Sequence, residues 1–251
     1  CIRDRFTGCS KKAESKVPDK LIVGTNAEFP PFEYMNDKKQ PEGFDIAMIK
    51  EIGKRMGKKV EIKNMEFKSL IGAMESDSIN AIIAGMTKTE KREKAVDFSD
   101  SYYTTNQAII LKKDSKITKL AQLDGKKIGV QEGTTGDLIS SGDKFGDGKK
   151  AKVLVKGAKV KRFKKGVDAV MDLKNGSVDA VVIDELTANE FVKKNAKKLK
   201  IVIDSAGSEY YCIALTKGNT AYKEEVNKQI KAIKEDGTYD KLKAKYIDSK
   251  N

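Results

Sequence analysis

Two short apolar runs place the strongest limit on the fold of this chain. Residues 81–85 read Ala-Ile-Ile-Ala-Gly, and residues 178–184 carry Ala-Val-Val-Ile before a final aspartate. Runs of this kind are typical of strands that are buried on both faces of a sheet. Such sheets carry helices on both sides, so the chain is predicted to be an α/β protein.

Strand and helix signals alternate along the rest of the chain. Further strands are expected at residues 21–24, 60–62, 108–111, 127–130 and 213–215, and amphipathic helices at residues 46–56, 70–74, 167–173 and 226–233. We expect Thr89 to cap a short helix, and Thr134 to open another in a Ser/Thr-x-x-Asp/Glu pattern. Two such series within 251 residues predict two lobes, each a mostly parallel sheet flanked by helices.

Composition excludes several classes of function. The chain has no histidine, which excludes Ser-His-Asp and Cys-His catalysis and histidine metal sites. Its three cysteines contain no Cys-x-x-Cys pair, so neither a metal nor a cofactor is expected. The formal charge of +13 comes from scattered residues, mostly lysine, without an arginine stripe between aromatics, so no nucleic-acid partner is expected. An association with an anionic cell-wall or membrane surface stays open.

Cys9 resembles the acylated cysteine in the lipobox of bacterial lipoproteins. It follows Thr7 and Gly8 and precedes a polar stretch that lasts to Asp19. The charged residues 1–5 differ from the apolar core of a signal peptide. We expect residues 1–19 to be a tether with a lipid on Cys9, which would hold the protein at the outer face of the membrane. An incidental cysteine near the terminus, in a protein of the periplasm, is the alternative.

Polar and aromatic side chains gather where the predicted strands end. In open α/β sheets, ligands bind beyond the carboxyl ends of the strands. Four of these ends supply Asn26, Phe29, Gly85, Met86, Thr87, Arg92, Gln131, Thr134, Thr135 and Asp184.

This set of residues suits a free amino acid. Arg92 offers a fork for an α-carboxylate, with donors at the helix start near Thr135. Asp184 and the backbone of Gly85 can take an α-ammonium group. Phe29 and Phe67 can pack against the ligand's side chain with their flat apolar rings, which favours a cationic head group. A surface ion pair is the alternative for the arginine, and a helix cap is the alternative for the aspartate.

The chain resembles the polar amino acid family of periplasmic-type binding proteins of ABC importers. The motifs that carry the resemblance occur between residue 20 and about residue 247. They lie at residues 24–33, 43–46, 84–92, 96–103, 129–136, 178–184 and 237–240. The resemblance implies a type II two-lobed fold that is joined by two hinge strands, near residues 104–108 and 205–210. Lobe 1 is expected at 20–105 plus 208–251, and lobe 2 at 106–207.

The resemblance also implies roles for single residues. Arg92 resembles the clamp on the ligand's α-carboxylate, with backbone donors at Thr87 and Thr135. Asp184 and the Gly85 carbonyl take the α-ammonium, Phe29 and Phe67 enclose the side chain, and position 26 contacts its tip.

Position 26 departs from many relatives that bind basic amino acids, which carry aspartate there. Asn26 is neutral, and it can donate or accept a hydrogen bond. Glu28 or Glu132 could restore a negative charge, and Gln131 suits an amide or a guanidinium group. Arginine or lysine is therefore the first expectation for the ligand, and glutamine the second.

The expected function is extracytoplasmic capture of a free polar L-amino acid by lobe closure, followed by delivery to the permease subunits of an ABC importer. We expect a monomer without enzymatic activity. A dehydratase on the same scaffold, with Glu28 and Glu132 as candidate acids, is one alternative. A detached sensory domain is the other.

Overall fold

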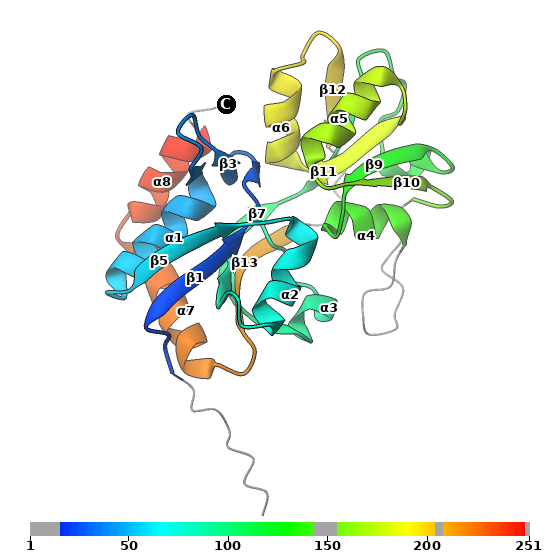
Figure 1. Ribbon diagram of the computed structural model, residues 1–251. Coiled ribbons are helices and arrows are strands. Elements are labelled where there is room, and N and C mark those ends of the chain that lie inside the picture. Colours follow the sequence, from blue (N-terminus) through cyan, green and yellow to red (C-terminus); the bar gives the residue numbers. More distant parts are fainter. Residues whose placement is uncertain (1–15, 143–154, 204–207, 249–251) are drawn as a thin grey trace, which may run out of the picture.

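The computed structural model describes residues 16–142, 155–203 and 208–248. Cys9 and most of the predicted tether lie outside these ranges. The elements group into two lobes, each built on one sheet (Figure 1), which confirms the predicted two-lobed α/β architecture.

The first sheet has the strand order β5-β1-β6-β13-β7. Its strands are β1 (Lys20–Thr25), β5 (Lys59–Asn64), β6 (Ala81–Ile82), β7 (Val96–Thr105) and β13 (Glu209–Thr216). A small sheet beside it contains β2 (Glu28–Phe29), β3 (Glu33–Met35) and β4 (Pro41–Glu42).

The second sheet has the order β10-β9-β11-β8-β12. Its strands are β8 (Gln107–Lys112), β9 (Lys127–Gln131), β10 (Lys159–Phe163), β11 (Ala180–Asp184) and β12 (Leu199–Ile203). All five residues of β11 are buried, as its apolar sequence predicts.

Both sheets are mostly parallel, as predicted, because four of the five strands in each run in the same direction. In the first sheet β1 runs parallel to β5 and β6, whereas β13 runs antiparallel to β6 and β7. The second sheet repeats this division, with β8 antiparallel to β11 and β12. Only β13 in the first sheet and β8 in the second run the other way. Each is the first strand after a passage between the lobes, so it enters its sheet in the opposite direction.

Helices cover both sheets, as Figure 1 shows. The first lobe carries α1 (Phe44–Arg55), α2 (Leu70–Glu75), α3 (Glu90–Glu93), α7 (Thr220–Glu235) and α8 (Thr238–Tyr246), with the short 3-10 helix η1 (Phe67–Ser69). The second lobe carries α4 (Thr135–Ser141), α5 (Gly166–Asn175), α6 (Glu185–Lys193) and the 3-10 helix η2 (Leu120–Leu123).

Two predicted helix starts are confirmed. The hydroxyl oxygens of Thr89 and Thr134 accept the N–H groups of Arg92 and Asp137 and so cap α3 and α4. Gly176 ends α5 in the left-handed conformation that glycine adopts without strain.

The chain passes between the lobes twice. The first passage joins β7 to β8 at Asn106, and the second leads from β12 to β13. Near these passages β13 pairs with β7, with Glu209 opposite Thr105. The lobe boundaries given above stay a prediction, and residues 204–207 of the second expected hinge lie outside the described ranges. Among the helices in the described ranges, none combines the length and the hydropathy of a membrane-spanning segment.

Candidate functional site

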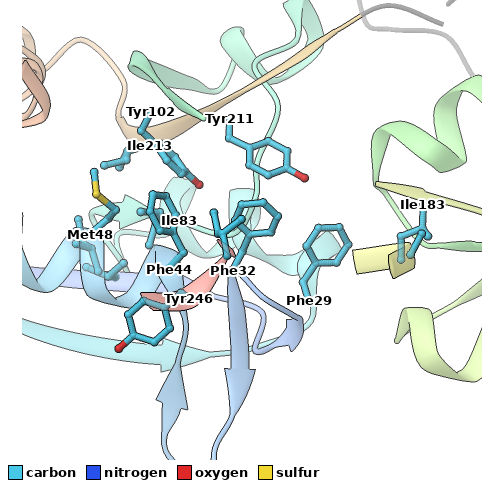
Figure 2. Packing of buried hydrophobic residues seen from close by; sticks show 14 of the residues in the cluster. Phe29, Phe32, Phe44, Met48, Ile83, Tyr102, Ile183, Tyr211, Ile213 and Tyr246 are labelled. Atoms are coloured by element: carbon cyan, nitrogen blue, oxygen red, sulfur yellow. The ribbon is translucent and has the colours of Figure 1, made fainter. Parts of the chain in front are cut away.

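A small cavity lies where the two lobes meet. About 280 Å³ of unfilled space, partly open to solvent, lies at this junction, and its lining residues come from both lobes: Asn26, Phe29, Phe67, Ala84, Gly85, Thr87, Arg92, Gln131, Thr134, Thr135 and Asp184. Figure 2 shows Phe29 at the end of a cluster of buried aromatic side chains, on the side of Ile183 in β11. The structure thus brings together every predicted site residue within its described ranges except Met86.

Met86 is buried in the hydrophobic cluster of α2, β6 and β13 and is absent from the cavity lining.

The neighbouring Gly85 has a φ of 52° and donates its N–H to the buried carboxylate of Asp45 at 2.8 Å. A Cβ at position 85 would stand 3.3 Å from the ring of Tyr211, so glycine lets the backbone approach the cavity closely.

Arg92 is held between the lobes. Its guanidinium donates to the carbonyl of Thr87 at 2.5 Å and, across the cleft, to the carbonyl of Gly133 at 3.0 Å. It also lies 5.3 Å from the ring centre of Phe67. Burial lowers the pKa of Arg92 to about 10, against the opposing effect of nearby carboxylates, so the group stays charged at neutral pH. Because no carboxylate of the described residues forms an ion pair with it, this buried guanidinium is suited to bind an anion.

Asp184 ends β11 on the opposite side of the cavity. It stands at the N-cap position of α6 but makes no side-chain capping bond, which argues against the alternative of a mere helix cap. Instead its carboxylate accepts a hydrogen bond from the amide of Gln107. Burial, together with the negative charge of Glu209, raises the pKa of Asp184 well above its usual range. A cation in the cavity relieves this cost, because it pairs with the carboxylate.

Two amides meet at the other end of the cavity. The side chain of Gln131 donates to Asn26 Oδ1 at 2.8 Å, and this bond joins the two lobes. Asn26 Nδ2 donates to the carbonyl of Met65 at 2.8 Å. Gln131 Oε1 is buried and has no hydrogen-bond partner among the described residues. This end therefore offers a free oxygen acceptor but no carboxylate.

Glu28 and Glu132 face lysines rather than the cavity. Glu28 pairs with Lys165 at 2.8 Å, and Glu132 pairs with Lys68 at 2.9 Å. A third pair joins Lys164 and Glu66 at 2.6 Å, and all three pairs join one lobe to the other. We call these three pairs the rim ion pairs. Their lysines neutralise the carboxylates that could have supplied charge for a cationic ligand.

Two residues near the cavity were not predicted from the sequence. Gln107 begins β8 and bonds both Asp184 and, at 3.3 Å, the hydroxyl of Thr135. Glu209 begins β13 and accepts from the hydroxyls of Thr87 and Thr135. Both positions lie within the two expected hinges, where polar side chains reach the cleft from the connecting strands. Within the described residues, no group of three or more histidine, cysteine or acidic side chains could hold a metal ion.

Comparison with known proteins agrees with this architecture. Residues 21–249 match the model of the bacterial extracellular solute-binding proteins, family 3. The arginine-binding extracellular protein ArtP of Bacillus subtilis (strain 168) is 34% identical over 98% of this chain and 94% of its own length.

Solved structures of an ancestral arginine-binding protein are also similar. The form bound to arginine is 42% identical, covers 92% of this chain and 100% of its own, and superposes with a TM-score of 0.82. The form bound to glutamine is 42% identical, covers 92% and 99%, and has a TM-score of 0.80. The fold, the match over nearly the whole chain and these relatives establish that the chain belongs to family 3 of the bacterial extracellular solute-binding proteins.

Proposed function

We propose that this protein captures a free polar L-amino acid outside the cytoplasm and delivers it to an ABC importer. One observation carries the proposal. Arg92 and Asp184, opposite charges from different lobes, line one cavity at the junction of the lobes. An α-amino acid carries the complementary pair of charges on adjacent groups, and few other small metabolites do.

Binding would couple to closure through these residues. A ligand that contacts Arg92 on one lobe and Asp184 on the other interacts fully only when the lobes are together, so it shifts the population toward the closed state. Arg92 and the hydroxyls of Thr87 and Thr135 take the α-carboxylate, and Asp184 takes the α-ammonium. Phe29 and Phe67 enclose the aliphatic part of the side chain.

The amide end of the cavity supports arginine as the first candidate. A guanidinium group has five N–H donors and no acceptor, and it can satisfy the buried Gln131 Oε1 while stacking on the aromatic walls. Lysine has fewer donors and a more strongly hydrated charge, so we rank it second. Glutamine is the alternative, since its amide also donates and Asn26 and Gln131 impose no charge.

Relatives support the route of delivery. The family is described as extracellular, and the arginine-binding relative carries the same description in its name. We also propose that a lipid on Cys9 anchors the protein at the membrane surface and that the protein is a monomer.

A thermal-shift screen tests the function directly. The probes are the standard amino acids with ornithine and citrulline, because a ligand that binds only the native state raises the melting temperature. Citrulline is the key comparison, since it has the shape of arginine without its charge. We expect arginine to give the largest shift. A flat response to every probe contradicts the proposal, and a shift with glutamine alone changes the ligand but keeps the class of function.

A further inference from the structure

Glu209 occupies an unusual place beside the cavity. It begins β13, the strand on which the chain returns to the first lobe, and it pairs in register with Thr105 of β7. Its Oε2 atom accepts one hydrogen bond from Thr87 Oγ1 at 2.7 Å and another from Thr135 Oγ1 at 2.6 Å. Thr87 follows β6 of the first lobe, and Thr135 begins α4 of the second. A single carboxylate oxygen thus ties both lobes together at the cleft.

Both threonines line the cavity, and under the proposed function their hydroxyls donate to the ligand's α-carboxylate. A hydroxyl group has one proton to donate. While the protons point to Glu209, neither hydroxyl can donate to a ligand.

The charge of Glu209 acts in the same direction. Burial lowers the pKa of Arg92, and the negative charge of Glu209 works against this shift. The same charge helps to raise the pKa of Asp184. Both effects show that its negative charge reaches the groups that would bind the two ends of an amino acid. A ligand carboxylate beside Arg92 therefore meets repulsion as well as attraction.

We propose that Glu209 is an internal competitor for the ligand's α-carboxylate: it binds the threonine hydroxyls and holds the lobes together while the cavity is empty. The ligand must displace it, so Glu209 lowers the affinity for every α-amino acid by the same factor. The inference rests on the proposed function, because it assigns the hydroxyls to an α-carboxylate. Competition at the α-carboxylate end leaves the choice among side chains unchanged.

Calorimetry with L-arginine and L-glutamine on the full chain tests the inference. Glu209→Ala removes both the charge and the acceptor. We expect about a tenfold tighter binding of whichever ligand the wild type binds, because the ligand no longer has to displace a charge-assisted hydrogen bond to Glu209. Glu209→Gln keeps an oxygen acceptor but loses the charge, so it should give a smaller gain. Glu185→Gln is the matched control: Glu185 accepts a bond from Asn106 at the other passage at 3.1 Å and does not line the cavity, so affinity should not change.

A second measurement does not depend on any amino acid. Small-angle X-ray scattering of the ligand-free proteins should give a larger radius of gyration for Glu209→Ala than for wild type and Glu185→Gln, since the bridge between the lobes is gone. Equal radii, or unchanged or weaker binding in Glu209→Ala, overturn the inference. A loss confined to arginine also overturns it, because Glu209 would then serve a cationic head group. If wild type binds no amino acid, the proposed function fails, and the scattering result alone decides whether Glu209 bridges the lobes.

Discussion

The two ends of the cavity differ in the kind of interaction they offer. The end that contains Arg92 and Asp184 carries two buried charges of opposite sign, and each has been taken from water at a cost in free energy. The end that contains Asn26 and Gln131 is neutral and is built from one amide pair. Under the proposed function, charge selects the class of ligand, whereas hydrogen-bond geometry and stacking select its side chain. Mutations at the charged end should thus cost the most.

Arg92→Ala should have the largest effect. It removes the partner of the α-carboxylate and leaves that charge buried without compensation, so binding should weaken by about 3–5 kcal/mol. Isothermal titration calorimetry with the ligand found in the screen measures the change. Lys91→Ala, an exposed position on the same helix, is the control and should bind like wild type. Normal binding by Arg92→Ala would show that the charged end lies elsewhere.

Asp184→Asn should rank second. The substitution keeps the size of the side chain but removes the charge that pairs with an α-ammonium, and we expect a loss of about 2–3 kcal/mol in the same calorimetric assay. Asp179→Asn changes a neighbouring aspartate whose carboxylate accepts the N–H of Lys127 at the surface. If both variants lose affinity equally, the loss comes from a disturbance of the structure around β11 rather than from a lost contact between Asp184 and the ligand.

Asn26→Asp tests the neutral end. The new carboxylate loses the bond to Met65 and lowers the affinity for any neutral ligand, but it pairs with a cationic head group. The ratio of the dissociation constants of citrulline and arginine should rise by about tenfold. A constant ratio would mean that position 26 does not contact the tip of the side chain.

Lys165→Ala should have the smallest effect. It breaks the rim ion pair with Glu28, in which the lysine is half exposed, so binding should change by less than about 1 kcal/mol and less still at high salt. Lys161→Ala, whose partner Asp172 lies in the same lobe, is the control. A loss as large as that of Asp184→Asn would place the Glu28 carboxylate in contact with the ligand.

Much of the fold follows from local sequence, because strands, helix caps and strand ends are encoded over short distances. The apolar run of β11 and the capping threonines of α3 and α4 are examples. The single reversed strand in each sheet, β13 and β8, was not predicted, since its direction depends on how the chain passes between the lobes. The directions of Glu28 and Glu132 depend on lysines of the opposite lobe, which no local pattern encodes. The same holds for Glu209, whose partners are 122 and 74 residues away along the chain.

The position of β13 has a consequence for the order in which the molecule assembles. The strands of the second sheet come from one continuous stretch of chain, from Gln107 to Ile203, so they can pair as soon as that stretch is available. The first sheet has to wait, because β13 belongs between β6 and β7. Until it arrives, both neighbours present unpaired edges that can join the wrong strand. The lobe that begins the chain is thus the last to be completed, and it is the one that depends most on protection during synthesis and export.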